Sequence, residues 1–303
     1  MAVVLAKAAA FVAIICMGYL LKKAGFFHAN DFYLISRIVL KITLPAAIVS
    51  NFSRISIDYS LLILCVIGLI CNIVTIIVGY LMNLSRSRKD KAFAMLNMSG
   101  YNIGNFTMPF VQSFLSPVGF AATSLFDAGN AVMCTGLTYS LASTVAGEDE
   151  VPSIKSMLKK LFSSVPFDAY IIMTVLGIFS IKLPSVVIDF ADTVGGANAF
   201  LALLMLGIGF EINMEKEKLK DIVKILITRY AIAIAMAVGF YFLAPFNQEI
   251  RQTLAIVSLG PVSSAAPAFT GAIKGDIEMA SAVNSLSIII SIAAITIALI
   301  VLL

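Results

Sequence analysis

Charge is scarce in this sequence. Only 13% of its 303 residues are charged, against 60% hydrophobic residues, and the mean hydropathy is +1.00. Ordinary soluble domains carry about twice that share of charged residues. A soluble globular protein is therefore excluded, and the apolar stretches leave no room for a sizeable domain outside a membrane.

Histidine and cysteine are also few. The single histidine, His28, has no second histidine or cysteine nearby, so we expect no zinc site and no other metal. The cysteines fall inside apolar runs and form no CxxC pair, which is typical of small residues that pack in a core. They are Cys16, Cys65, Cys71 and Cys134.

Catalytic and nucleotide-binding motifs are missing. The sequence contains no GxSxG, HExxH or P-loop motif and no paired catalytic aspartates, and a lone histidine removes most acid–base schemes. We therefore expect no enzyme, no cofactor and no self-contained ATP-driven pump. The net charge of +4 alone would suit a nucleic-acid binder, but the positions of the basic residues have another explanation, given below.

Long apolar runs fill the chain. Runs of about 17 to 25 residues separated by short polar turns are typical of transmembrane helices. They predict an all-α polytopic membrane protein with ten transmembrane helices, near residues 3–21, 32–52, 59–84, 91–114, 118–144, 166–181, 193–211, 218–243, 250–272 and 276–302.

The ten spans divide into two similar halves. A shift of 158 positions lays the first five spans over the second five and carries Pro109 onto Pro267. A repeat with an odd number of crossings inserts its two copies in opposite orientations. We therefore predict two inverted five-helix repeats, residues 1–145 and 165–303, joined by a cytoplasmic linker at 146–164.

Basic residues indicate the orientation. Three of the 21 lysines and arginines lie in even-numbered loops and fourteen in odd-numbered loops, which the positive-inside rule places in the cytoplasm. We predict a multi-pass protein of the plasma or inner cell membrane, with both termini extracellular or periplasmic. The basic residues then mark topology, and no nucleic-acid partner is expected. The fourteen are Lys22, Lys23, Arg86, Arg88, Lys89, Lys91, Lys155, Lys159, Lys160, Lys216, Lys218, Lys220, Lys224 and Lys274.

Two proline-containing segments interrupt apolar spans at matched positions in the two halves. Residues 102–109 interrupt the fourth span, and residues 260–267 interrupt the ninth. A broken helix in lipid leaves backbone N–H and C=O groups unpaired, which is tolerated only where protein or water receives them. Matched interruptions of this kind point to the binding site of a secondary transporter.

Polar residues in these segments are the candidate substrate ligands. An interrupted helix presents free backbone donors and the positive end of a half-helix, which suit a carboxylate. The amides of Asn102 and Asn105 can donate without a permanent charge. The alternative is that they only satisfy carbonyls freed by the break, as hydroxyls often do in membrane helices. The predicted substrate-binding set is Asn102, Asn105, Pro109, Ser263, Ser264 and Pro267.

Asp127, inside the fifth span, is the candidate for energetic coupling. An ionisable residue there is costly and indicates function. Buried without a cation it favours its protonated form and can carry a proton, whereas beside Asn105 it would help to hold Na⁺. A structural role, hydrogen bonding to the broken backbone, is the third alternative. Asn130, one turn later, and Asn284, near the equivalent place in span ten, complete the coupling set.

Arg229 stands out among the basic residues because it lies well inside the eighth span. Snorkelling explains Arg37 and Lys41, which lie near the end of a span. Arg229 is expected either to pair with a carboxylate or to line the cytoplasmic path of an anion.

Several short segments follow one another in a recognisable order along nearly the whole chain. They are residues 18–27 (GYLLKKAGFF), 44–48 (LPAAI), 105–109 (NFTMP), 203–209 (LLMLGIG), and Pro267 followed by 274–276 (KGD). In this order the chain resembles the auxin efflux carrier family, which includes bacterial organic-acid carriers and the plant auxin exporters.

The resemblance implies a ten-helix fold related to that of the bile-acid symporters, with two discontinuous helices crossing at mid-membrane. It also implies a panel of spans 1, 2, 6 and 7, with a homodimer contact as an option, that moves against a core of the other spans. The span-four asparagine would contact substrate. The sodium-coupled branch has an acidic residue near its second crossover, whereas residues 257–270 here contain no Asp or Glu.

The predicted function is secondary active transport of a small organic anion by alternating access, coupled to a proton or to Na⁺. Malate, malonate or an auxin-like acid would fit a site made of two amides and helix ends. The alternatives are a passive anion channel or uniporter and a sodium-coupled symporter of the bile-acid type. Channels usually show rings or repeated pore motifs, whereas this chain shows a paired, inverted break.

Overall fold

A computed structural model describes the chain from residue 2 to residue 302, apart from residues 29, 57, 149–151 and 211–215. Met1 and Leu303, on which the prediction for the termini depends, lie outside the described residues, as does part of the predicted linker. Within the described residues every regular element is a helix, and one isolated β-bridge joins two turns.

The first half contains eight α-helices and four short π or 3-10 turns. They are α1 (Ala2–Lys23), α2 (Asp31–Ile38), the π-turn Val39–Thr43, α3 (Leu44–Phe52), the 3-10 turn Tyr59–Leu62, α4 (Ile63–Leu81), α5 (Arg88–Met98), the π-turn Ile103–Thr107, α6 (Met108–Phe114), α7 (Pro117–Val132), the π-turn Met133–Leu137 and α8 (Thr138–Ala146).

The remainder contains α9 to α16. They are α9 (Ile154–Leu161), α10 (Val165–Ile178), α11 (Ser185–Gly196), α12 (Asn198–Gly209), the 3-10 turn Lys216–Lys218, α13 (Leu219–Leu243), α14 (Gln248–Ser258), α15 (Ala266–Ala272) and α16 (Ile277–Leu302).

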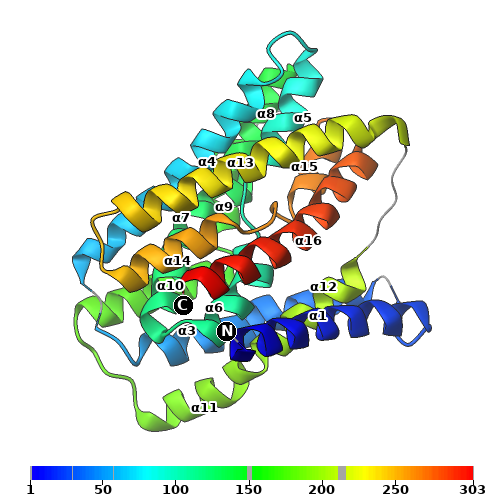
Figure 1. Cartoon of the computed structure of the whole chain (residues 1–303). Helices are drawn as coiled ribbons and strands as arrows, with labels where there is room; N and C mark the ends of the chain where they lie inside the picture. Colours follow the sequence, from blue (N-terminus) through cyan, green and yellow to red (C-terminus); the bar gives the residue numbers. More distant parts are fainter. Residues whose placement is uncertain (1, 29, 57, 149–151, 211–215, 303) are drawn as a thin grey trace.

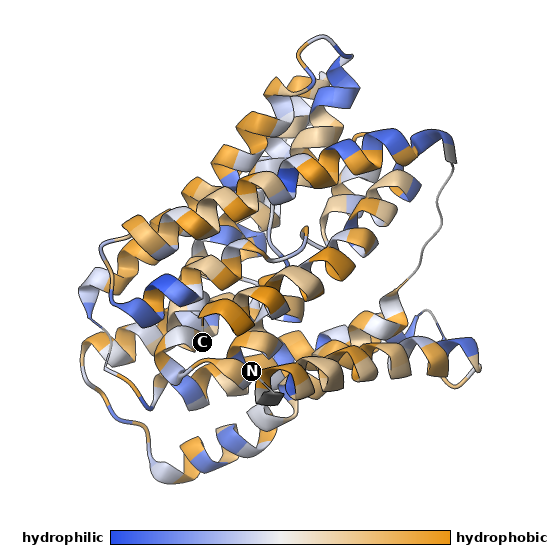
Figure 2. Cartoon of the chain, viewed as in Figure 1, coloured by the Kyte–Doolittle hydropathy of each residue, from blue (hydrophilic) through white to orange (hydrophobic). Residues whose placement is uncertain are grey.

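Six helical segments among the described residues are long and apolar enough to cross a membrane, or seven if the bent pair α9–α10 is one span. This confirms a polytopic, all-helical membrane protein. The predicted fourth, fifth and ninth spans are not in that number. The fourth and ninth are each divided into two shorter helices, and the π-turn Met133–Leu137 interrupts the fifth. Hydrophobic residues follow the lengths of the helices, and hydrophilic ones gather at ends such as the α4–α5 turn and the start of α13 (Figure 2).

The helices form two groups, seen at the bottom and the top of Figure 1. In the panel group, α1 packs on α12, and α3 packs on α10 and α11. In the core group, α4 packs on α5 and α7, α13 on α14, and α15 on α16. Close helix contacts within each group depend on glycine, as is common in membranes. A side chain at Gly207 of α12 would collide with the backbone of Ile15 in α1, and one at Gly129 of α7 would collide with the backbone of Cys65 in α4.

The breaks in the fourth and ninth spans lie earlier than the prolines at their ends suggest. Helix α5 ends at Met98, Gly100 takes a left-handed φ of +78°, and helical structure resumes at Ile103. Pro109 lies where the π-turn Ile103–Thr107 passes directly into α6, inside the helical segment that follows the break. The prediction that the first break extends to Pro109 was therefore wrong.

The second break behaves similarly. Helix α14 ends at Ser258, and helical structure resumes at Ala266, so the break contains Pro261. Pro267 lies in the first turn of the helix that follows. Both matched prolines therefore follow the breaks: Pro267 lies at the start of its half-helix, and Pro109 lies where a π-turn passes into α6.

Candidate functional site: the crossing of two broken helices

The two breaks meet in the core group through their backbones. The Asn102 N–H donates to the Pro261 carbonyl at 3.0 Å, and the Ser263 N–H donates to the Gly100 carbonyl at 3.2 Å. Tyr101 and Val262 form an antiparallel bridge between these two bonds. Each break thus supplies hydrogen-bond partners to the other, which lipid cannot do.

Asparagines support the first break from neighbouring helices. Asn130 of α7 binds both backbone groups of Tyr101, accepting from its N–H at 3.0 Å and donating to its carbonyl at 2.9 Å. Asn72 of α4 accepts from the Gly100 N–H at 2.7 Å and is itself bonded to Asn130 at 3.2 Å. The amide of Asn130, predicted for the coupling set, therefore holds the broken backbone.

The second break has a similar support from α16. The Ser287 hydroxyl accepts from the Val262 N–H at 3.1 Å. The Asn284 amide donates to the carbonyls of Val262 at 3.0 Å and Ser263 at 3.2 Å. Each residue of the bridge pair thus has its N–H and C=O bound by side chains. Asn284, also predicted for the coupling set, is not part of the cavity described next.

A cavity of about 160 Å³ lies beside the crossing, between the core and panel groups. Its polar lining comes mainly from the core, and α10 and the segment around Leu40 and Leu44 close it from the panel side. The predicted residues that line it are Asn102, Asn105, Asp127, Asn130, Ser263 and Ser264. The prolines Pro109 and Pro267 do not line it.

The amides of Asn102 and Asn105 stand apart from the other asparagines. Neither forms a side-chain hydrogen bond within the described residues, and the buried Oδ1 of Asn105 has no partner. Both residues are more than 90% buried. An unpaired amide is costly in an apolar interior, and such groups are rare in native proteins. Other asparagines of the core group donate to protein acceptors: Asn72, Asn97, Asn130 and Asn284.

Comparison with known proteins decides the family. The model of a family described as membrane transport protein matches residues 3–303. The chain belongs to this family, that of the auxin efflux carriers. No curated protein matches it significantly. The carrier is therefore a membrane transport protein, and its crossing and cavity can be considered as parts of a transport site.

Asp127 of this carrier faces the cavity from α7. Its Oδ2 accepts a hydrogen bond from the Tyr170 hydroxyl at 3.0 Å, and its Oδ1 accepts from the Asn130 amide at 2.8 Å. Among the described residues, no cation forms an ion pair with it. Tyr170 belongs to α10, so this hydrogen bond joins the panel group to the core group.

Sequence reasoning missed Tyr170, Asn72 and Ser287. Tyr170 could be seen in the sequence as a tyrosine within the sixth span, but nothing in the sequence indicates that it contacts Asp127. Arg229 was singled out, but its partners were not predicted: its guanidinium donates to backbone carbonyls at the crossing, including that of Gly100 at 3.0 Å.

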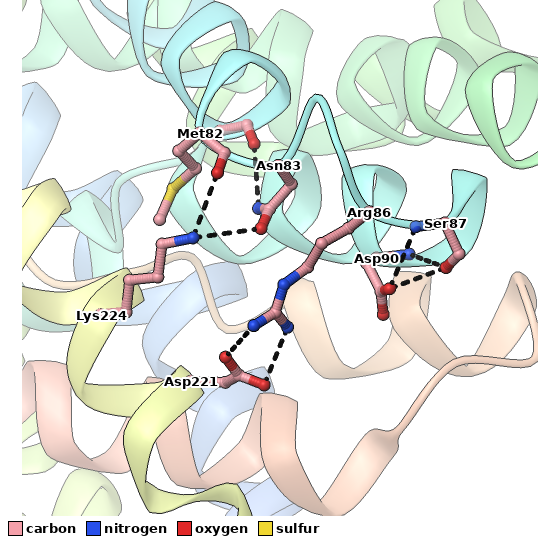
Figure 3. Close-up of polar contacts among 8 residues, drawn as sticks. Met82, Asn83, Arg86, Ser87, Asp90, Asp221 and Lys224 are labelled. Atoms are coloured by element: carbon pink, nitrogen blue, oxygen red, sulfur yellow. Dashed lines mark hydrogen bonds and ion pairs between the residues drawn. The ribbon is translucent and has the colours of Figure 1, made fainter.

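A second polar cluster of the carrier lies where α4 ends and α5 and α13 begin (Figure 3). Arg86, in the turn before α5, forms an ion pair with Asp221 of α13 at 2.9 Å. Lys224 donates to the Met82 carbonyl at 3.1 Å. Lys218 pairs with Asp276 nearby, at 2.7 Å. These contacts gather three of the predicted odd-numbered loops at one end of the core group.

Proposed function

We propose that the protein is a secondary active transporter of a small organic anion, which binds in the cavity beside the crossing. The observation that carries this proposal is the pair of unpaired amides, Asn102 and Asn105. A carboxylate in the cavity would accept hydrogen bonds from the Nδ2 groups of both amides, which donate to no protein acceptor among the described residues. The hydroxyl of Ser264, from the second break, adds a third donor.

The lining suits release as well as binding. No lysine or arginine side chain lines the cavity within the described residues. A direct charged pair would hold a carboxylate firmly in a site of low dielectric constant, whereas neutral amides bind it more weakly. The cavity volume of about 160 Å³ is below the roughly 300–1,000 Å³ of sites that hold drug-sized ligands. A small acid such as malonate or malate is of that size class.

For the architecture, we propose the two inverted halves, residues 1–145 and 165–303, with the linker 146–164 in the cytoplasm. Support comes from the breaks, which occur once in each half, pair in antiparallel fashion and receive equivalent side-chain support. With both termini outside, the panel would move against the core, and cargo would ride in the cavity between them.

The cavity suggests the state of the transport cycle. Ser164, the last residue of the linker, and Pro166 and Phe167, just after it, line the cavity, so the mouth of the cavity would face the cytoplasm. On the other side of the crossing, Gln112 of α6 donates to the Gly195 carbonyl at 3.0 Å, and the Asn198 amide donates to Gln112 at 3.3 Å. These bonds join core to panel and would close the outer path in an inward-facing state.

For coupling, we propose that Asp127 carries a proton. Its partners are a hydroxyl and an amide, which suit either charge state of a carboxylate. Sodium is the alternative ion. The second crossing offers hydroxyls and amides but no acid, since residues 257–270 contain none.

The test has two parts. Purified protein is screened by thermal shift against small carboxylates, with and without Na⁺ and across pH, because a ligand that binds the folded state raises the melting temperature. The best ligand is then followed into proteoliposomes under separately imposed pH and Na⁺ gradients. A carrier accumulates labelled cargo by exchange against unlabelled cargo inside, whereas a passive channel does not. Absence of stabilisation by any carboxylate, together with absence of exchange, would defeat the proposal.

A further inference from the structure

Arg229 carries a charge that the proposed binding site does not use. It lies in the middle of α13, is only 2% exposed, and its guanidinium stays protonated in proteins. A charge in a membrane span is costly and normally pairs with an opposite charge or with backbone carbonyls. Among the described residues, no Asp or Glu forms an ion pair with it.

The partners of Arg229 are carbonyls from both breaks. Its Nη1 donates to Met98, the last residue of α5. Its Nη2 donates to Gly100 at 3.0 Å and to Gly260 at 3.2 Å. Only a planar fork of several donors can reach three carbonyls in this way, and a lysine cannot reproduce it in full. Arg229 is thus placed at the crossing by both halves of the chain.

The charge balance at the crossing gives this placement a consequence. Two half-helices end at the crossing, and two begin there. Each end carries a partial charge of about half an elementary charge, negative where a helix ends and positive where it begins, so the four ends roughly cancel. When Asp127, the acid that lines the cavity, holds the proton proposed for it above, Arg229 leaves the crossing with a net positive charge. Its guanidinium carbon lies 5.1 Å from the ring centre of Tyr101, and Tyr101 lines the cavity.

We propose that Arg229 selects anionic cargo from behind the crossing, without touching it. The inference rests on the proposed function and adds a positioning residue to it. Amides of Asn102 and Asn105 would orient a carboxylate or a neutral amide alike, whereas the field of Arg229 favours only the anion. Tyr101 and the paired backbone separate the charges, which spares the cargo a firm ion pair. For unit charges about 10 Å apart at an effective dielectric constant of about 20, the preference is roughly 10- to 20-fold.

The test uses probes matched in shape and different in charge: malonate with malonamide, and phenylacetate with phenylacetamide. Affinities are measured for the parent and for the variants Arg229→Lys and Arg229→Gln. Both replacements donate hydrogen bonds to carbonyls, but only lysine is charged. We expect Arg229→Lys to keep most of the carboxylate preference and Arg229→Gln to lose it by roughly 10-fold, while affinity for the amides changes little.

The outcomes separate the two proposals. If the parent binds neither carboxylate, or binds each amide as well as its acid, the proposed function fails. If the parent prefers acids and folded Arg229→Gln keeps that preference, only the role of Arg229 fails. If both variants lose the preference to the same extent, Arg229 acts through geometry alone, and the electrostatic role is overturned.

A second pair of variants leaves Arg229 in place, in case its replacement prevents folding. Leu226 is buried three residues earlier on the same face of α13 and does not line the cavity. Leu226→Glu places a carboxylate where it can pair with Arg229 and cancel its charge, and Leu226→Gln is the uncharged control. The proposal expects loss of the acid preference in Leu226→Glu and its retention in Leu226→Gln. Equal preference in the two would overturn it.

Discussion

The two breaks share a backbone design but differ in the groups that surround them. At the first break, Asn130 holds the backbone of Tyr101 and also binds Asp127. At the second, Asn284 and Ser287 hold the backbone of Val262, and no acid lies near in the sequence. The comparison teaches that backbone support alone needs only neutral side chains. The acid at the first break is therefore an addition that support does not explain.

The largest effect is expected from making the first break as neutral as the second. Asp127→Asn keeps the shape and hydrogen bonding of the side chain but cannot change its charge. If Asp127 carries the proton, this variant loses pH-driven accumulation in proteoliposomes and keeps cargo exchange. Sodium binding would instead predict loss of Na⁺-dependent stabilisation at constant pH. Accumulation equal to that of an Asp189→Asn control, an exposed acid on α11, would end the coupling hypothesis.

Removing the support should cost more at the first break than at the second. Asn130→Ala leaves the N–H and C=O of Tyr101 unpaired and should lower the free energy of unfolding by about 2–5 kcal/mol. Asn284→Ala leaves two carbonyls with one partner fewer, while Ser287 keeps its bond to Val262, so the expected loss is about 1–3 kcal/mol. Thermal melting of the two variants in detergent shows which of them loses more stability. Equal melting temperatures would contradict the difference.

The cavity donors should show a smaller and different effect. Asn105→Ala removes an amide with no protein partner, so we expect unchanged stability and a loss of cargo affinity of roughly 1–3 kcal/mol, or about 5- to 150-fold. Ser264→Ala, the matched change at the second break, should weaken binding by about 2- to 10-fold because one neutral hydrogen bond is lost. Isothermal titration with the best carboxylate compares them. A well-folded Asn105→Ala with parental affinity would assign that amide to another role.

The smallest effect on stability is expected from two ion pairs that join the fourth and ninth spans to the start of α13 and the turn before it. Asp276, after α15, pairs with Lys218, and Arg86, before α5, pairs with Asp221. Partial burial alone would raise the pKa of Asp276, but the hydrogen bond from Lys218, the backbone N–H groups of Met279 and Glu278 and the charge of Lys218 together lower this pKa below its ordinary value. A lowered pKa in the folded state means that the stabilisation is complete above the ordinary value near 3.8 and is lost as the pH falls through the folded value.

We therefore expect Asp276→Asn to lower the free energy of unfolding at neutral pH by less than about 1 kcal/mol, because the pair is one-third exposed. The melting temperature should fall slightly as a result. The difference from the parent should shrink in strong acid and in high salt. Melting curves at pH 7 and at acid pH measure it. A difference that grows on acidification would show that the pair does not behave as described.

The sequence predicted the membrane class, the two breaks and the main polar lining of the cavity, because each is a local violation of an apolar pattern. Asn102, Asn105 and Asp127 were visible for that reason. The exact position of the first break was not predicted correctly. Prolines drew attention, but Pro109 lies inside the helical segment that follows the break, and the break depends on Gly100, whose left-handed φ has a weaker sequence signal.

Long-range partners could not be predicted from the sequence. Tyr170 reaches Asp127 from 43 positions away, and Arg229 reaches Gly100 from 129 positions away. Such pairs depend on how helices from the two halves pack together, and no local pattern in a single sequence indicates that packing. The division of the asparagines into bonded and unpaired groups is also a tertiary property, since Asn72, Asn97 and Asn105 all stand in similar apolar surroundings along the chain.

The tight packing of α1 on α12 has a consequence for biogenesis. Helix α1 is synthesised long before its partner α12, which begins only at Asn198. At about 5–20 residues per second, the glycine-lined face of α1 waits roughly ten to forty seconds for α12 to be synthesised. During that time the panel cannot form, and a nascent chain halted after α8 lacks it altogether. Until the second half arrives, lipid or other membrane-inserted helices cover the face of α1 that later packs on α12.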